Sequence, residues 1–450
     1  MNKKIIFGLI IVILIGVGVW MSTRPAEEKP VQIAPPEKSE IAVGDAGYGW
    51  SIKDDPKEAV KEAVSLMKQR LEGKTPKYVL FFTGIGKGNI GYNPEEIIAE
   101  IRNQLGPNVQ IHGGSSSIGV LTKEGFHIGD VGSLALIAVA SERMDFGVAG
   151  VSLDEFSPQE AGKKAIELAM KNAQKEGLPQ IVYMTASPGV EEKILPGIEE
   201  VLGIDIPIIG GSGGDNNLTG KWHEFANDNI YTNGVVLTAV YTDLKIGQDY
   251  EHSYLSSENK GIATKVEGRV LYEIDGKPAA EVYNEWTGGL VKEILKKGGT
   301  ILSEVSAFYP LARGVKGAGK EIFYISVMPY TVNEDKSLGL FANIETGDEV
   351  MLLHGTWELL LNRAYSTPKK ALSVKAIPSG KGLFGIYTFC AGAMFAVPEV
   401  ERAKFPVLVD NALGGIPFIG AFTLGEQIFL PGTGNRHANL VNSMIVFSEE

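Results

Sequence analysis

Glycine-rich bends that also carry a hydroxyl or a thiol group occur at three points of the chain. They are Thr83-Gly84, the run from Thr185 to Gly189 that includes Ser187, and the run from Cys390 to Gly392. Each bend follows an apolar run typical of a buried strand, so we expect each to lie at a strand's carboxyl end. In α/β sheets, ligands bind beyond these ends, where the first N–H groups of the following helices are unpaired. Alternatively, glycine occurs there only because the backbone needs a positive φ or close packing. The recurrence of the same construction at three places nevertheless predicts that at least one bend faces a ligand.

A turn rich in serine hydroxyl groups follows the next expected strand. Its sequence is HGGSSS, residues 112–117. Ser115 and Ser116 could donate hydrogen bonds to a carboxylate or carbonyl group of a ligand, or they could cap the backbone of their own turn. The turn lacks the G-x-x-x-x-G-K-[ST] spacing of a phosphate-binding loop, so we do not expect a nucleotide.

The corresponding turns later in the chain carry acidic side chains. The run from Gly210 to Asp215 contains Ser212, and Glu426 follows Leu424-Gly425 in what we interpret as the third copy of the turn. A carboxylate there could bind the ammonium group of a ligand, or Asp215 could form an Asx turn with its own backbone. If the ligand is an amino acid, we expect Asp215 or Glu426 to bind its ammonium group.

Two arginines and the single cysteine complete the candidate residues. Arg313 and Arg436 could pair with a ligand carboxylate, because guanidinium groups bind carboxylates bidentately, or they could form ordinary salt bridges. Cys390 ends an apolar strand and is most simply a small buried residue, since a nucleophile there would need a neighbouring base. The six histidines are scattered without metal-binding spacing. We therefore expect no metal, no other cofactor and no catalytic residue.

The composition excludes some classes of partner. The 450 residues carry 42 Lys+Arg against 54 Asp+Glu, a formal net charge of −12. The sequence shows no stripe of basic residues of the kind that a nucleic-acid-binding face needs, so we expect no nucleic-acid partner. With 44% hydrophobic and 21% charged residues, the chain has the balance of a folded globular protein.

The N-terminal segment predicts contact with a membrane. Residues 5–21 form an apolar run that Lys3 and Lys4 precede. With the uncharged residues that follow, the run approaches the length of a membrane span, so we interpret residues 1–23 as a single transmembrane signal anchor and the proline-rich residues 24–42 as a linker. The two lysines favour a cytoplasmic N-terminus and an extracytoplasmic body at the cell membrane. The alternative is a signal peptide whose cleavage leaves a secreted protein.

An internal repeat organises the remainder of the chain. Residues 45–141 and 145–241 share one order of expected elements, namely β-α-β-α-β, a glycine-rich turn and further strands. We expect a third, more diverged unit to begin with MLLHGTWELLLNRAY at residues 351–365, after a β-rich insertion between the second and third units. Alternating strands and helices predict an α/β fold with mixed sheets.

Several separated motifs resemble those of the FIST family, whose members have an amino-terminal and a carboxy-terminal FIST domain. The first domain is matched by HGGSSSIGVL and IPIIGGSGGD, and the second by YEIDGKPAAEVY, FYPLAR, SLGLFANIETGDEV, YTFCAGAM and IPFIGAFTLGEQ. The resemblance implies an amino-terminal-like domain at residues 43–242 and a carboxy-terminal-like domain at residues 243–450. It also implies a sensory module that binds a small molecule, such as an amino acid, for signal transduction.

The resemblance leaves the output of the signal to another molecule. No kinase, cyclase or methyl-accepting segment follows the second domain, so we expect a separate signalling partner. The chain also has Ala393 where the family tends to place an arginine after the Cys-x-Gly bend. Two other functions stay open: a hydrolase-type enzyme that uses a serine or cysteine at one of the bends, and a scaffold that binds no ligand.

Overall fold

The computed structural model of the protein describes residues 44–302, 304–317, 319 and 321–450. The expected transmembrane segment 1–23 and the linker 24–42 lie outside these residues. Within the described ranges, no helix is both long and apolar enough to cross a membrane.

The first two copies of the sequence repeat fold alike. Each consists of a strand, a helix, a strand, a helix, a strand, a two-stranded hairpin and a closing strand, which confirms the predicted order. The first unit contains β1 (Ala46–Ser51), α2 (Pro56–Arg70), β2 (Tyr78–Ile85), α3 (Pro94–Leu105), β3 (Gln110–Ser116), β4 (Val120–Thr122), β5 (Gly125–His127) and β6 (Gly132–Val139). The second contains β7 (Met144–Ser152), α4 (Pro158–Ala173), β8 (Ile181–Ala186), α5 (Glu191–Leu202), β9 (Ile208–Ser212), β10 (Glu224–Ala226), β11 (Asn229–Tyr231) and β12 (Gly234–Thr242).

Local sequence explains where the helices of these units begin. The side chains of Asp55, Asn93 and Ser157 accept hydrogen bonds from the backbone N–H groups of the first turns of α2, α3 and α4. Each of these three helices also has proline at its start, where the missing N–H group costs nothing. The apolar faces of the helices are thereby held against their sheets.

The third unit begins earlier than the sequence suggested. Its first strand is β13 (Lys245–Glu251), which pairs antiparallel with the closing strand β27 (Asn442–Ser448), as β1 pairs with β6 and β7 with β12. The prediction that residues 351–365 supply the first strand and helix is wrong for the strand, because β22 (Glu349–His354) belongs to the insertion. The rest of the unit is α8 (Trp357–Val374), β23 (Gly382–Cys390), α9 (Ala391–Phe395), α10 (Glu399–Arg402), α11 (Phe405–Leu413), β24 (Phe418–Thr423), β25 (Glu426–Leu430) and β26 (Gly434–Ala438).

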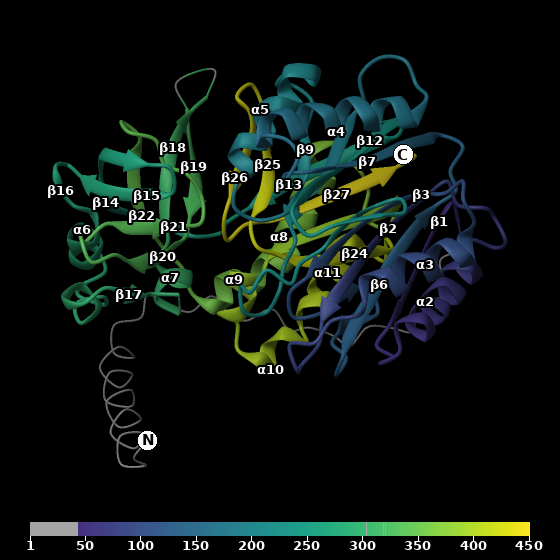
Figure 1. Cartoon of the computed structure of the whole chain (residues 1–450), viewed down its shortest axis with the longest axis horizontal. Coiled ribbons are helices and arrows are strands. Elements are labelled where there is room, and N and C mark those ends of the chain that lie inside the picture. The colour runs from purple at the N-terminus through teal and green to yellow at the C-terminus, as the bar shows by residue number, and fades with distance from the viewer. Residues whose placement is uncertain (1–43, 303, 318, 320) are drawn as a thin grey trace, which may run out of the picture. The chain divides into compact units, whose positions relative to one another are not determined.

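The β-rich insertion therefore interrupts the third unit, between β13 and α8, instead of preceding it. It has its own apolar core, in which Leu271, Tyr283 and Val350 are buried. In Figure 1 its strands lie together at one side of the described chain. Its elements are β14 (Leu255–Glu267), β15 (Val270–Ile274), β16 (Lys277–Pro278), α6 (Ala279–Trp286), η1 (Ile294–Lys296), β17 (Gly299–Thr300), α7 (Glu304–Phe308), β18 (Leu311–Lys316), β19 (Ile322–Val327), β20 (Pro329–Val332), β21 (Leu338–Leu340) and β22.

Each unit forms four strands of one mixed sheet and lends its hairpin to the sheet of another unit. The sheet β1-β6-β2-β3 of the first unit is extended by β10-β11 of the second. In the same way β7-β12-β8-β9 is extended by β25-β26 of the third unit, and β13-β27-β23-β24 by β4-β5 of the first. The exchange is cyclic, so no sheet is complete without a strand pair from another unit.

One apolar core joins the three sheets. It contains buried side chains from every sheet, such as Tyr78, Tyr183 and Ile386. Alternate residues along the strands point the other way, so that Phe81 packs against α2 and α3, and Met184 against α4 and α5. The helices thus cover the outer faces of the sheets, while the inner faces pack on one another (Figure 1).

Candidate functional site

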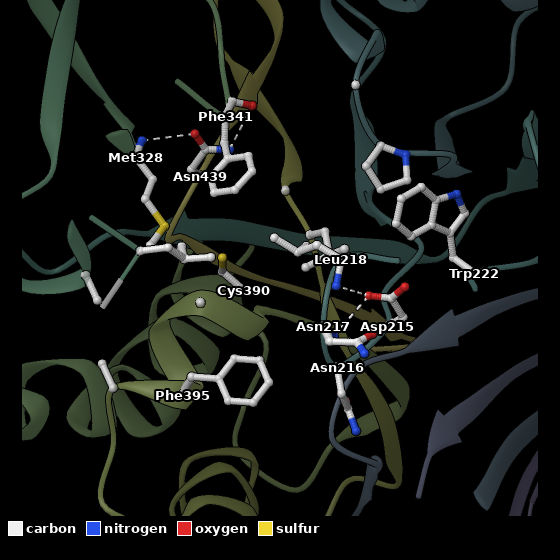
Figure 2. A pocket seen from close by; sticks show the side chains of 18 of the residues that line it. Asp215, Asn216, Asn217, Leu218, Trp222, Met328, Phe341, Cys390, Phe395 and Asn439 are labelled. Atoms are coloured by element: carbon white, nitrogen blue, oxygen red, sulfur yellow. Dashed lines mark hydrogen bonds between the residues drawn. The ribbon is translucent and has the colours of Figure 1, made fainter. Parts of the chain in front are cut away.

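A cavity of about 520 Å³ opens at the carboxyl ends of β8 and β23. Figure 2 shows the side chains of Cys390 and Phe395 on one side of it and those of Asp215, Leu218 and Trp222 on the other. The cavity is of the size that small-molecule sites have. Its lining consists of Pro188, Gly189, Asp215, Asn216, Asn217, Leu218, Trp222, Arg269, Leu302, Ala307, Met328, Phe341, Cys390, Gly392, Phe395, Ala396, Leu424, Gly425 and Asn439.

Three parts of the chain build these walls. The second unit supplies the bend at Pro188-Gly189 and the loop of residues 215–222, and the third unit supplies the bend and short helix of residues 390–396 together with Leu424-Gly425. The insertion supplies Arg269 at the tip of the β14–β15 hairpin and four apolar side chains. Two of the three bends that the sequence singled out therefore face one cavity.

The first bend lies elsewhere and is covered by backbone. A Cβ atom added at Gly84 would stand 2.5 Å from the Cα atom of Gly119, and one at Gly86 would stand 2.5 Å from the carbonyl oxygen of Asp130. At Gly392 the nearest atom to such a Cβ would be the flexible sulfur of Met328, at 3.3 Å. The close-packing explanation therefore holds for the first bend, and the ligand-facing explanation fits the third.

Strand register shows which positions of the units correspond. Gly114 of β3 lies between Phe82 and Glu224, Gly211 of β9 between Thr185 and Glu426, and Ala421 of β24 between Thr388 and Val120. Ser115 and Ser212 are therefore equivalent, as predicted. Glu426 is equivalent to Glu224 and not to Asp215, so that our sequence alignment of the acidic turns is wrong. Phe82, Thr185 and Thr388 are thus equivalent, and so are the residues two positions later, which are Gly84, Ser187 and Cys390.

The side chain of Asp215 lies at the cavity but is engaged by its own loop. Its carboxylate accepts hydrogen bonds from the backbone N–H groups of Asn217, Leu218, Thr219 and Lys221. Of the two roles considered for Asp215, the structure shows the turn-forming one. This loop carries Leu218 and Trp222 into the cavity wall.

Five of the six candidate hydroxyl groups are buried, and none of the six lines the cavity. Ser115 accepts a hydrogen bond from the backbone N–H of His223 at 3.0 Å, and Ser116 donates to the carbonyl oxygen of Gly119 at 2.6 Å. The hydroxyl of Thr185 lies 2.9 Å from Nε2 of His112, and Ser212 donates to Glu191 at 2.5 Å. These groups hold strands and turns together, and Thr83, half-buried on the first bend, also lies away from the cavity.

Two buried glutamates stand directly behind the cavity wall at equivalent positions. Glu224 accepts a hydrogen bond from Ser187 at 2.9 Å, and Glu426 accepts one from Thr423 at 2.7 Å. Burial raises the pKa of each carboxyl group to about 8, so both are largely protonated at neutral pH. Glu426 follows Gly425 of the lining but does not itself reach the cavity.

An ion cluster that the sequence did not reveal ties the insertion to the second unit. Arg269 pairs with Glu191 at 2.7 Å and with Glu192 at 2.6 Å, at the start of α5. Burial alone would raise the pKa of Glu191, but nearby His437, Arg269 and the Ser212 hydrogen bond outweigh it and lower that pKa. No local pattern of the sequence indicates this pairing, since the partners of Arg269 lie about eighty residues away.

The remaining candidates have simple environments. Burial raises the pKa of the Cys390 thiol, and Glu426 raises it further, so the thiol at the cavity wall is protonated and a weak nucleophile at neutral pH. Arg313 lies on β18, outside the cavity lining, 3.6 Å from Asp348, and Arg436 donates to backbone carbonyl groups. Among the residues that the structure describes, no cluster of His, Cys, Asp and Glu could hold a metal ion.

Comparison with known proteins gives the chain its family. Residues 77–277 match the model of the FIST N domain, and residues 279–428 match that of the FIST C domain. An uncharacterized protein of Methanocaldococcus jannaschii, MJ1623, is 35% identical over 112 residues, which are 24% of this chain and 21% of that protein. The aligned segment thus spans only about a fifth of that relative's length.

Two solved structures are distant matches. A cyanuric acid hydrolase from A. caulinodans has 9% sequence identity and a TM-score of 0.37, over 90% of this chain and 99% of its own. The PurL protein of T. maritima, complexed with FGAR, has 10% identity and a TM-score of 0.21, over 90% of this chain and 72% of its own. Because the two FIST models together cover most of the described residues, the chain belongs to the FIST family, whose domains are sensory domains that bind small ligands in signalling.

Proposed function

We propose that this protein is a sensor whose ligand occupies the cavity between the second unit, the third unit and the insertion. The observation that carries the proposal is the location of the cavity. It lies at the carboxyl ends of parallel strands, where α/β sheets bind ligands, and two equivalent bends of the repeat face it. The family's sensory role supports the same conclusion.

The walls of the cavity suggest how occupancy is reported. A ligand that touches Leu218 and Phe395 of the units and also Met328 and Phe341 of the insertion joins two parts of the chain that have separate cores. Such a ligand stabilises the arrangement of these two parts to which it binds more tightly. The shift in the equilibrium between arrangements is set by the ratio of its affinities for them. A separate signalling partner would then recognise the favoured arrangement.

The location of the sensor in the cell rests on the sequence alone. The apolar run of residues 5–21, with Lys3 and Lys4 before it, supports a membrane anchor with the body outside the cytoplasm. Protease added to intact spheroplasts should then release the body by cleaving the linker. A fully protected body would contradict this orientation, and a body that is found free in the medium before treatment would favour cleavage of a signal peptide.

The ligand site is tested by a thermal-unfolding screen of the full chain against amino acids, organic acids and uncharged metabolites. A ligand at 100 times its Kd raises stability by roughly 2.7 kcal/mol. Gly392→Phe fills the cavity and should abolish the shift in Tm, whereas Leu168→Phe, on the exposed face of α4, should leave it intact. If the shift persists in Gly392→Phe, the ligand binds elsewhere and the proposal fails.

A further inference from the structure

Resting on this proposed site, we infer that the ligand is an uncharged molecule with a mainly apolar skeleton. An anion such as a free carboxylate is excluded. Such a ligand differs from an amino acid, which carries a carboxylate and an ammonium group. Three features of the wall favour it: the apolar side chains, the partners of the polar groups, and the charges around the cavity.

The contact surface is made of large apolar side chains. Trp222, Phe341 and Phe395 present aromatic rings, and Met328, Leu218 and Leu302 add flexible aliphatic surface. Burying apolar area contributes roughly 25 cal/mol per Å², so a ligand that covers this lining binds through its carbon skeleton. Three of these side chains, Leu218, Leu302 and Phe395, are 42%, 42% and 44% exposed. Exposed apolar groups gathered at a cavity are typical of binding sites.

Three polar side chains of the wall already have partners, whereas the buried Nε of Arg269 has none. The amide of Asn439 accepts from the backbone N–H of Met328 at 3.0 Å and donates to the carbonyl oxygen of Phe341 at 3.4 Å. The amide oxygen of Asn216 accepts from the N–H of Ile118 at 2.7 Å, and the carboxylate of Asp215 accepts four backbone hydrogen bonds. A charged ligand group would lose its hydration in this cavity, and none of these three groups is free to compensate it.

The charges at the cavity oppose an anion. Among the described residues, the one lining cation is Arg269, which is paired with Glu191 and Glu192, and Asp215 adds a third carboxylate. A ligand carboxylate at Arg269 would share the guanidinium group with these two glutamates and approach like charges. A glutamate that lost its pairing with Arg269 would be left as a desolvated charge, which is strongly unfavourable.

Two fluorescent probes with nearly the same skeleton test the inference. N-phenyl-1-naphthylamine is uncharged at neutral pH, and 8-anilino-1-naphthalenesulfonate carries a sulfonate on that skeleton. We expect the uncharged probe to bind the full chain at least tenfold more tightly, with an affinity that is insensitive to salt. Gly392→Phe should remove this binding, as should Ala396→Phe, a second substitution at the wall that serves if the first does not fold. Leu168→Phe is again the control.

The outcomes separate this inference from the proposed site. Tighter binding of the sulfonate, lost in Gly392→Phe, overturns the inference and leaves the site standing. Failure of both probes also overturns it, because an apolar wall of this size must take an apolar probe. If probe binding is equal in the parent and in both filled variants, the cavity is not the binding site, and the proposed function fails as well.

Discussion

The bend after β2 and the bend after β23 occupy equivalent positions of the repeat but have opposite surroundings. At Gly86 the backbone of residues 130–131 lies against the bend, whereas the matching Gly392 lies at an open cavity and touches only flexible side chains. The position that Glu426 occupies in the repeat also differs between these units. In the third unit the buried Glu426 pairs with Gly211, whereas in the first unit the equivalent Val120 pairs with Ala421. A repeat thus predicts the backbone, and the segment that packs over each copy decides whether it can bind.

The pH dependence of stability should show the largest difference between the units. The folded state raises the pKa of Glu224 and Glu426 from 4.5 to about 8. Their stabilising contribution is complete below pH 4.5 and is lost as the pH rises through about 8, on the order of 4 kcal/mol for each group.

Urea unfolding between pH 5 and pH 9 measures this effect. The difference between Glu426→Gln and the parent isolates the one group, and the variant should gain relative stability as the pH rises. For Val120→Leu in the first unit, the difference in the free energy of unfolding from the parent should be the same at every pH. A constant difference between Glu426→Gln and the parent would mean that the carboxyl group does not titrate in this range.

Adding one methyl group to each bend should be the next largest effect. Gly86→Ala places a Cβ atom 2.5 Å from backbone atoms that cannot move aside, and overpacking of this kind costs roughly 1–3 kcal/mol. Gly392→Ala meets only flexible side-chain atoms, with the Met328 sulfur at 3.3 Å and Cδ2 of Leu440 at 3.4 Å, and should cost less than about 0.5 kcal/mol. Free energies of unfolding from urea titrations of both variants test the contrast, and equal losses would refute it.

Arg269 should matter for both folding and binding, because only the second and third bends have the insertion beside them. Arg269→Met removes the pair with Glu191 and Glu192 and should lower the free energy of unfolding by about 1–2 kcal/mol, since the arginine is one-fifth exposed. It should also weaken probe binding several-fold. Arg313→Met, which loses only a 3.6 Å contact with Asp348 outside the cavity lining, should leave probe binding unchanged.

The sequence predicted the α/β class, the order of elements in the first two units and the equivalence of Ser115 and Ser212, because these follow from local periodicity and turn residues. It misplaced the start of the third unit, since an insertion of about a hundred residues separates β13 from α8. The hairpin exchange between units and the pairing of Arg269 with Glu191 are long-range contacts that no local pattern encodes. For the same reason the sequence identified the two bends as candidate ligand sites but did not predict that the insertion lies opposite them.

Cys390 allows the most direct test of the central claim, that the cavity is the ligand site. It is the single cysteine of the chain and lines the cavity, so its modification reports on one place. Because the thiol is protonated at neutral pH, its reaction with methyl methanethiosulfonate is slow, and the rate can be followed by intact mass with and without saturating N-phenyl-1-naphthylamine. We predict that the probe slows the reaction at least tenfold. An unchanged rate while fluorescence shows saturation would place the ligand elsewhere and contradict the claim.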